Sequence, residues 1–152
     1  MEVLIVDDVA VMRIIIKNIL VKHCAIPENK IYEAESGRDA IRKFKQLRVG
    51  YVLLDINMPD IDGVAVIKEL VKLDPGVHTI MCTSSKDKRI LLQCMRAGAK
   101  DYILKPPVPQ RVARALGIEI LQNEQPENEQ SKTKIDDEDI IIPKGSGGPR
   151  RI

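Results

Sequence analysis

The sequence predicts an α/β fold in which a parallel β-sheet is covered by helices on both faces. Short apolar runs alternate with longer amphipathic stretches five times before residue 122. Such alternation is typical of strand–helix units joined into a parallel sheet. The apolar runs are short and mostly free of charge, as expected for strands buried on both sides. The length of 152 residues suits one domain with a real core.

The first half of the domain contains two and a half of these units. "EVLIV", residues 2–6, reads as a buried strand, and a helix over 9–23 follows it despite many β-branched residues. "KIYEAE", 30–35, is a more polar strand, and "GRDAIRKFKQL", 37–47, is a helix with its apolar side chains on one face. "YVLLD", 51–55, reads as the third strand.

The second half of the domain repeats the strand–helix alternation, with clearer signals for where the helices end. A helix over 63–73 is closed by the turn signal "DPG", and "HTIMCT", 78–83, is the fourth strand. A helix over 87–98 ends at Gly98, a typical C-terminal stop. The last unit comprises the strand "DYILK", 101–105, and the helix "PQRVARALGIEIL", 109–121.

The apolar strands one, three, four and five suit interior positions, and the polar second strand suits an edge. This matches the flavodoxin-like, doubly wound five-stranded parallel sheet of strand order 2-1-3-4-5. We therefore expect one domain over residues 1–121. Residues 122–152 are polar and interrupted by proline, and we expect a tail that is disordered or docks on a partner, with "DIIIP" as a candidate added strand.

The composition excludes several classes of function. The net charge of +2 is too small to favour nucleic acid or an anionic membrane, and no apolar run approaches the ~18 residues of a membrane span. Cys24, Cys82 and Cys94 lack C-x-x-C spacing, so we expect buried, reduced thiols. The N-terminus becomes acidic too early for a signal peptide, and we expect a cytoplasmic protein.

Polar residues follow four of the five strands. Asp7 and Asp8 follow the first, Asp55 the third, and Lys105 ends the fifth, while the fourth ends at Thr83. Ligands of doubly wound sheets bind outside the carboxyl ends of the strands, where the strand order reverses. We therefore expect these residues to share one site, to which the edge strand, the second, need not contribute.

That set of side chains predicts phosphoryl transfer. Clustered carboxylates repel one another, and oxygen ligands at a wet site favour Mg²⁺, for which Mn²⁺ can substitute. An ammonium and a hydroxyl suit phosphoryl oxygens, which leaves one carboxylate, best Asp55, as the nucleophile. Taken singly, Asp8 could be a helix N-cap, Thr83 a strand residue and Lys105 a solvated surface lysine; the joint pattern argues otherwise.

The motifs "LIVDD", "LLDINMPDIDG", "TIMCTSS" and "AKDYILKP" resemble the response-regulator receiver domain of two-component signalling, over roughly residues 1–121. "DDVAVMRIIIKNIL" looks most like the single-domain chemotaxis-type regulators. Pro107 and the tail depart from the usual pattern. The resemblance implies a signalling switch, without turnover of an external substrate, that catalyses its own phosphorylation and slow dephosphorylation.

The resemblance also implies residue roles. Asp55 would accept phosphate, and Mg²⁺ would be held by Asp7, Asp8, Asp55 and the backbone carbonyl of Asn57. Thr83 and Lys105 would contact the phosphoryl group, with Tyr102 as the switching aromatic residue. Further positions are implied by their place in the motifs: a cis peptide bond before Pro106, and side chains that tune dephosphorylation at Asn57 and Ser85.

Neither His23 nor His78 has a phosphotransfer context, so the donor is another protein or a small acyl phosphate. The resemblance implies a sensor histidine kinase or phosphotransfer protein. Output would pass through the face formed by the helix 87–98, strand 101–105 and last helix, to an effector such as the flagellar switch. We expect basic side chains there, near apolar ones, and a monomer or a phosphorylation-dependent dimer: Arg96, Lys100, Arg111 or Arg114, near Ile90 and Leu91.

Two other classes of function compete with this interpretation. A metal-dependent phosphohydrolase with Asp55 as nucleophile typically has a second acid two residues later, where this chain has Asn57. A flavin-binding electron carrier is disfavoured by acid where the flavin phosphate would lie and by the scarcity of aromatic residues. No helix-turn-helix pattern follows the last helix, which argues against DNA binding by this chain.

Overall fold

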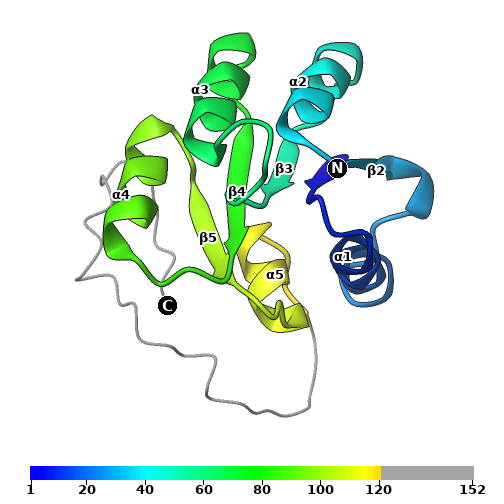
Figure 1. Ribbon diagram of the computed structural model, residues 1–152. Helices are drawn as coiled ribbons and strands as arrows, with labels where there is room; N and C mark the ends of the chain where they lie inside the picture. Colours follow the sequence, from blue (N-terminus) through cyan, green and yellow to red (C-terminus); the bar gives the residue numbers. More distant parts are fainter. Residues whose placement is uncertain (121–152) are drawn as a thin grey trace.

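The computed structural model describes residues 1–120, which form a five-stranded parallel sheet of order β2-β1-β3-β4-β5 (Figure 1). The strands are β1 (Val3–Val6), β2 (Ile31–Ala34), β3 (Tyr51–Leu54), β4 (His78–Thr83) and β5 (Asp101–Leu104). The predicted fold class and strand order are confirmed. The predicted tail over 122–152, including "DIIIP", lies outside the described residues.

Helices cover both faces of the sheet (Figure 1). They are α1 (Ala10–Lys22), α2 (Gly37–Gln46), α3 (Gly63–Leu73), α4 (Lys88–Ala97) and α5 (Pro109–Ala115), with a short 3-10 helix, η1 (Glu28–Lys30), before β2. Side chains alternate across each strand, so Val3 and Ile5 pack with α1 and α5, whereas Leu4 and Val6 pack with α2, α3 and α4. The site is thus carried by a sheet with a core on each side.

The burial of the strands follows their place in the sheet. β1 is buried at every residue, as a central strand of a parallel sheet must be. The second strand is an edge, as predicted, and its middle residues, Tyr32 and Glu33, are partly exposed. The prediction that the fifth strand is interior was wrong. β5 is the other edge and is mostly half-buried, because its outer side has no neighbouring strand among the described residues.

Glycines end the last two helices. Gly98 has a φ of 126°, and the amides of Gly98 and Ala99 donate to the carbonyls of Met95 and Cys94, which confirms the predicted stop. Gly117, with a φ of 75°, ends α5 in the same way. The prediction of a helix through residue 121 was therefore wrong, because Gly117 reverses the backbone before the apolar pattern ends. The 3-10 helix η1 was also not predicted.

The three cysteines are free and buried, as predicted. Burial raises the pKa of the Cys82 thiol to about 12 and that of Cys94 to about 11, and it also raises the pKa of Cys24. These thiols stay neutral near pH 7 and act as small apolar core groups. None of the helices within residues 1–120 has the length and hydropathy of a membrane-spanning segment.

Gly63 shows how closely the loop after β3 packs on α3. A Cβ added to Gly63 would lie 2.6 Å from the Cα of Ile56, the residue that follows Asp55. We expect Gly63→Ala to lower the free energy of unfolding by ~1–3 kcal/mol, the usual cost of overpacking. Urea titration measures this value. Gly50→Ala is the matched control, because nothing lies within 4 Å of its Cβ; equal stability of the two variants would contradict the packing argument.

Candidate functional site

Three carboxylates gather where β1 and β3 end. Asp7 follows β1 directly and Asp55 follows β3, and these strands are neighbours in register, with Val6 beside Leu54. Asp7, Asp8 and Asp55 each offer a carboxylate oxygen, and these three atoms lie within 4.8 Å of one another. Asp7 is only 1% exposed and Asp55 5%, whereas Asp8 is open to solvent. The predicted acid cluster is therefore present.

Lys105 brings a positive charge to these acids from the end of β5. Its Nζ donates to Asp7 Oδ2 at 2.9 Å and lies 3.6 Å from Asp55 Oδ2. Burial lowers the pKa of Lys105, but the hydrogen bond that its ammonium donates to Asp7 and the charges of Asp55 and Asp7 raise it more, so the net shift is upward. Lys105 is not the solvated surface lysine of the alternative interpretation. The Lys105–Pro106 peptide bond is cis.

The environment of Asp55 makes ionisation costly. Burial is the largest influence and raises the pKa of its carboxyl; the amide of Asn57, which donates to Oδ1 at 3.1 Å, and the charge of Lys105 lower it. Asp7 and Asp8 raise it further, and the net shift is upward. A buried carboxylate among like charges is stabilised strongly when a cation binds beside it or when its own charge changes.

Three of the other predicted residues, Thr83, Ser85 and Asn57, lie at or just beyond the carboxyl ends of β4 and β3. Tyr102 lies inside β5, two residues before its end. Thr83 is fully buried at the end of β4, and its Oγ1 accepts the amide of Ser85 at 2.9 Å. Ser85 in turn accepts the amide of Asp87, the N-cap residue of α4, at 3.1 Å. Asn57 is exposed just beyond Asp55, and Tyr102 is half-buried in β5. The β4 residue is therefore linked to the start of α4 by one chain of hydrogen bonds.

The donor set of this cluster fits Mg²⁺. Oxygen ligands and a partly solvated position suit a cation that keeps several of its waters. The alternative that Asp8 is only a helix cap finds no support, because Val9 is the N-cap residue of α1 and no side chain caps that end. The exposed Asp8 carboxylate is thus not engaged in capping the helix.

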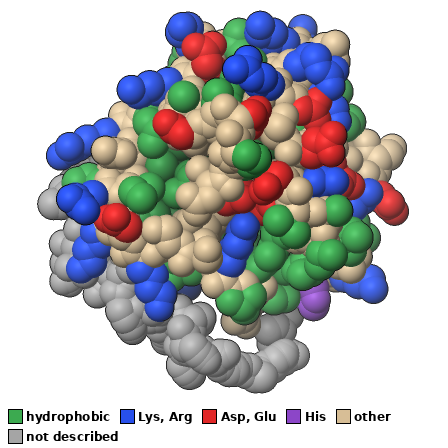
Figure 2. Space-filling view, in the orientation of Figure 1, with side chains coloured by type: hydrophobic (Ala, Val, Ile, Leu, Met, Phe, Trp, Pro, Cys, Tyr) green, Lys and Arg blue, Asp and Glu red, His purple; other side chains and the backbone are tan. Residues whose placement is uncertain are grey.

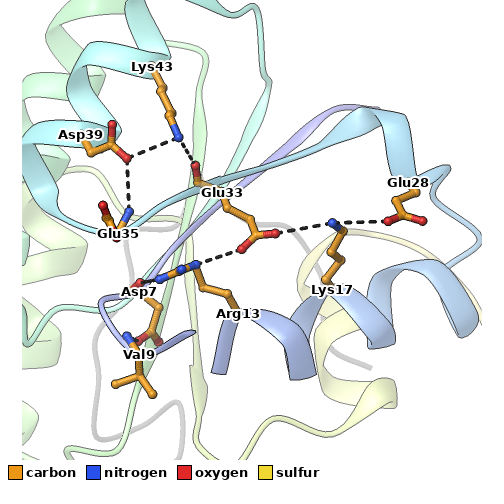
Figure 3. Close-up of polar contacts among 9 residues, drawn as sticks. All are labelled: Asp7, Val9, Arg13, Lys17, Glu28, Glu33, Glu35, Asp39 and Lys43. Atoms are coloured by element: carbon orange, nitrogen blue, oxygen red, sulfur yellow. Dashed lines mark hydrogen bonds and ion pairs between the residues drawn. The ribbon is translucent and has the colours of Figure 1, made fainter. Parts of the chain in front are cut away.

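Arg13 is a site residue whose contacts were not predicted. Its Nη1 donates to the backbone carbonyl of Asp7 at 2.6 Å, and its Nε donates to Glu33 Oε1 in β2 at 2.9 Å (Figure 3). The expectation that the edge strand need not contribute was therefore incomplete. One signal was available: Arg13 lies in the first turns of the helix after Asp7 and Asp8, and Glu33 is the acidic residue of the polar strand.

The predicted output face needs two corrections. Leu91 is fully buried and belongs to the core. Arg111 is not an isolated surface cation, because it pairs with Asp101 at 2.8 Å and donates to the carbonyl of Tyr102 at 2.6 Å, with its guanidinium 5.8 Å from the Tyr102 ring centroid. Three of the predicted cations are exposed: Arg96, Lys100 and Arg114. The half-buried Ile90 lies on α4 with Arg96.

Comparison with known proteins gives consistent matches over the described part of the chain. The family model for the response regulator receiver domain matches residues 3–117. Among curated proteins, the chemotaxis protein CheY of Thermotoga maritima is 41% identical over 115 residues, covering 76% of this chain and 93% of the relative. CheY of Bacillus subtilis is 40% identical, with the same coverage.

Solved structures agree with these matches. A CheY-like receiver domain protein from Methanospirillum hungatei superimposes with a TM-score of 0.70 at 27% identity, covering 76% of this chain and 90% of that one. The CheX-CheY-BeF3-Mg complex from Borrelia burgdorferi gives a TM-score of 0.68 at 28% identity, covering 76% and 85%. Each of these relatives and structures covers about three quarters of this chain.

The charge of Asp55 should cost the metal-free protein stability. Because its pKa is raised in the folded state, ionisation destabilises the fold above that pKa, and the cost disappears as the pH falls below it. We expect Asp55→Asn to raise the melting temperature at pH 7 in EDTA, and the gain to shrink on acidification. Calorimetric melts between pH 4 and 7 measure both.

Asp60→Asn is the control with the opposite sign. Burial raises the pKa of Asp60, but hydrogen bonds from the amides of Arg38 and Gly37 lower it more. An Asn side chain has one carbonyl oxygen and so keeps only one of these two bonds. The free energy of unfolding of the variant should therefore be about 0.5–2 kcal/mol lower at pH 7. This difference in stability between the wild type and Asp60→Asn shrinks as the pH falls through the lowered pKa of Asp60. A loss of stability in Asp55→Asn at pH 7 would refute the account of this site.

Proposed function

This chain belongs to the response regulator receiver domain family of two-component signalling, and on that premise we propose that it is a switch phosphorylated on Asp55. The gathering of Asp7, Asp8 and Asp55 around Lys105 carries the proposal, because it combines a nucleophile, cation ligands and a phosphoryl-contacting ammonium. Mg²⁺ would be held by these carboxylates and the Asn57 carbonyl, with Mn²⁺ as a substitute. When bound, the cation neutralises charge on the phosphoryl oxygens.

The transfer step needs little chemistry from the protein. A carboxylate oxygen of Asp55 forms a bond to phosphorus while the bond between phosphorus and the donor nitrogen or acyl oxygen breaks, and the leaving atom keeps the electron pair. Lys105 already lies 3.6 Å from Asp55 and can follow the developing charge of the phosphoryl oxygens. In slow dephosphorylation, water attacks the phosphorus, the bond from phosphorus to the Asp55 oxygen breaks, and inorganic phosphate leaves. Asn57 and Ser85 control the approach of the water.

The switch follows from the chain of hydrogen bonds that begins at Thr83. A hydrogen bond from the Thr83 hydroxyl to the new phosphoryl group draws this side chain toward Asp55, and the Tyr102 side chain moves into the space left. Ser85 and the N-cap of α4 follow, because they are bonded in series to Thr83. This is a population shift, limited by how differently the phosphoryl group binds the two states.

The donor, a sensor histidine kinase or phosphotransfer protein, can dock on the exposed apolar face of α1. Val11 is 62% exposed and Ile14 56%, and the helix begins at Ala10, two residues after Asp8. Figure 2 shows hydrophobic side chains gathered where Figure 1 places α1, beside acidic side chains. A helical donor whose apolar side chains cover this face would bring its phosphohistidine to Asp55.

Output through the α4, β5 and α5 face suits an acidic effector surface. Arg96, Lys100 and Arg114 give that face a positive charge, and Arg111 ties Tyr102 and Asp101 of β5 to α5. We place the protein among the chemotaxis-type regulators of the cytoplasm, acting on an effector such as the flagellar switch. Its state is a monomer or a phosphorylation-dependent dimer, and this chain does not bind DNA.

Phosphorylation is tested with acetyl phosphate and Mg²⁺, followed by intact-mass spectrometry. The wild type should gain the mass of one phosphoryl group, and Asp55→Asn should not. Lys105→Gln should label at least about 10-fold more slowly, since it loses a charged contact worth roughly 1.5–3 kcal/mol. Labelling of Asp55→Asn equal to the wild type would disprove the assignment. Steady turnover of an added phosphomonoester would instead favour the phosphohydrolase.

The switch is tested with fluorotyrosine-labelled protein and beryllofluoride plus Mg²⁺. The ¹⁹F resonance of Tyr102 should shift on addition in the wild type and should stay unshifted in Thr83→Ala, which lacks the hydroxyl. Tyr32 and Tyr51 lie outside the proposed path and serve as internal controls. If the Tyr102 resonance shifts as much in Thr83→Ala as in the wild type, Tyr102 does not depend on the Thr83 hydroxyl and the proposed coupling is refuted.

A further inference from the structure

The three carboxylates of the site differ in how they are held. Asp7 accepts the amide of Val9 on one oxygen and Lys105 on the other, both at 2.9 Å. Asp55 accepts the amide of Asn57 at 3.1 Å. Within residues 1–120, no hydrogen bond or ion pair reaches the Asp8 carboxylate, which is exposed. The direction in which Asp8 points is therefore set by its backbone.

That backbone is held by one side chain. The carbonyl of Asp7 belongs to the peptide unit that joins Asp7 to Asp8, and it accepts Nη1 of Arg13 at 2.6 Å. The peptide unit is planar, so a bond to this carbonyl also fixes the plane from which Asp8 departs. Arg13 lies about one turn into α1 and reaches back to the loop that precedes its own helix.

Arg13 is itself held from the edge strand. Its Nε donates to Glu33 Oε1 at 2.9 Å, and Lys17 lies 3.4 Å from the other Glu33 oxygen (Figure 3). The Arg13 side chain is only 16% exposed, so this contact is better shielded from solvent than a typical surface pair. Lys43 donates to the Glu33 carbonyl at 2.6 Å, which anchors the acceptor on α2 as well. A guanidinium fork suits this role because its separate N–H groups bond two acceptors at once.

We propose that Arg13, oriented by Glu33, is the residue that positions Asp8 for binding of the divalent cation. It acts through the peptide unit between Asp7 and Asp8 and is a positioning residue, not a ligand. This inference rests on the proposed function, because it concerns the cation of the same site. It assigns the edge strand β2 a part in the site, through Glu33, although β2 supplies no ligand itself.

The sign of the effect separates positioning from simple electrostatics. A positive charge near a cation site repels the cation, so removing Arg13 only as a charge would tighten binding. Removing it as a positioning residue weakens binding, as loss of partners that orient metal ligands does, typically 10–100-fold. Lys17→Gln provides the control, because Lys17 pairs with Glu33 but makes no contact with Asp7.

The experiment measures Mn²⁺ binding to the full chain by electron paramagnetic resonance of the free ion. We expect Arg13→Gln to raise the dissociation constant at least about 10-fold. Glu33→Gln should raise it less, and Arg13→Lys should also weaken binding, because an ammonium is a point charge without the guanidinium fork. Lys17→Gln should stay within about twofold of the wild type or bind slightly tighter. Circular dichroism melts verify that each variant is folded.

The possible results distinguish the role of Arg13 from the proposed function. Mn²⁺ binding by Arg13→Gln as tight as the wild type, or tighter, overturns the role of Arg13 and leaves the proposed function standing. If Arg13→Gln does not fold, Arg13→Lys and Glu33→Gln decide, and unchanged binding in both overturns the role. If the wild type binds no Mn²⁺, or Asp8→Asn binds it equally well, the proposed cation site fails and this inference fails with it.

Discussion

The structure depends on holding two carboxylates nearly out of water at the ends of adjacent strands. Asp7 and Asp55 lie side by side because β1 and β3 are neighbours in register, and both are buried. Burial and mutual repulsion make this arrangement unfavourable for ionised acids. Lys105 offsets part of the cost by pairing with both. The remaining cost would fall if a cation bound there or if the charge of Asp55 changed.

Two sets of contacts connect this site to the rest of the domain. On one side, Thr83, Ser85 and Asp87 connect the end of β4 to the start of α4 by successive hydrogen bonds. On the other, Arg13 and Glu33 connect the loop after β1 to the edge strand β2. The first path is suited to move, because it consists of a loop and a helix end. The second is suited to stay in place, because it joins a helix to a strand.

Particular elements show why sequence reasoning succeeded or failed. The periodic apolar runs predicted every strand, because a central parallel strand needs apolar side chains on both faces. They overextended α5, because the apolar pattern continues past Gly117 while the backbone does not. The resemblance placed Leu91 beside the exposed cations of the output face, although Leu91 is fully buried and belongs to the core. Periodicity identifies amphipathic faces but leaves open where each face meets its neighbour.

By itself the sequence determined the class of fold, the strand order and the candidate residues of the site, because acids, a hydroxyl and a lysine stand at strand ends that a parallel sheet brings to one edge. Only the tertiary structure decided how those groups are held. The contacts of Arg13, the pairing of Arg111 with Asp101 and the shared ammonium of Lys105 each join different elements of the fold. Such contacts depend on side-chain direction and helix packing, which no local pattern encodes.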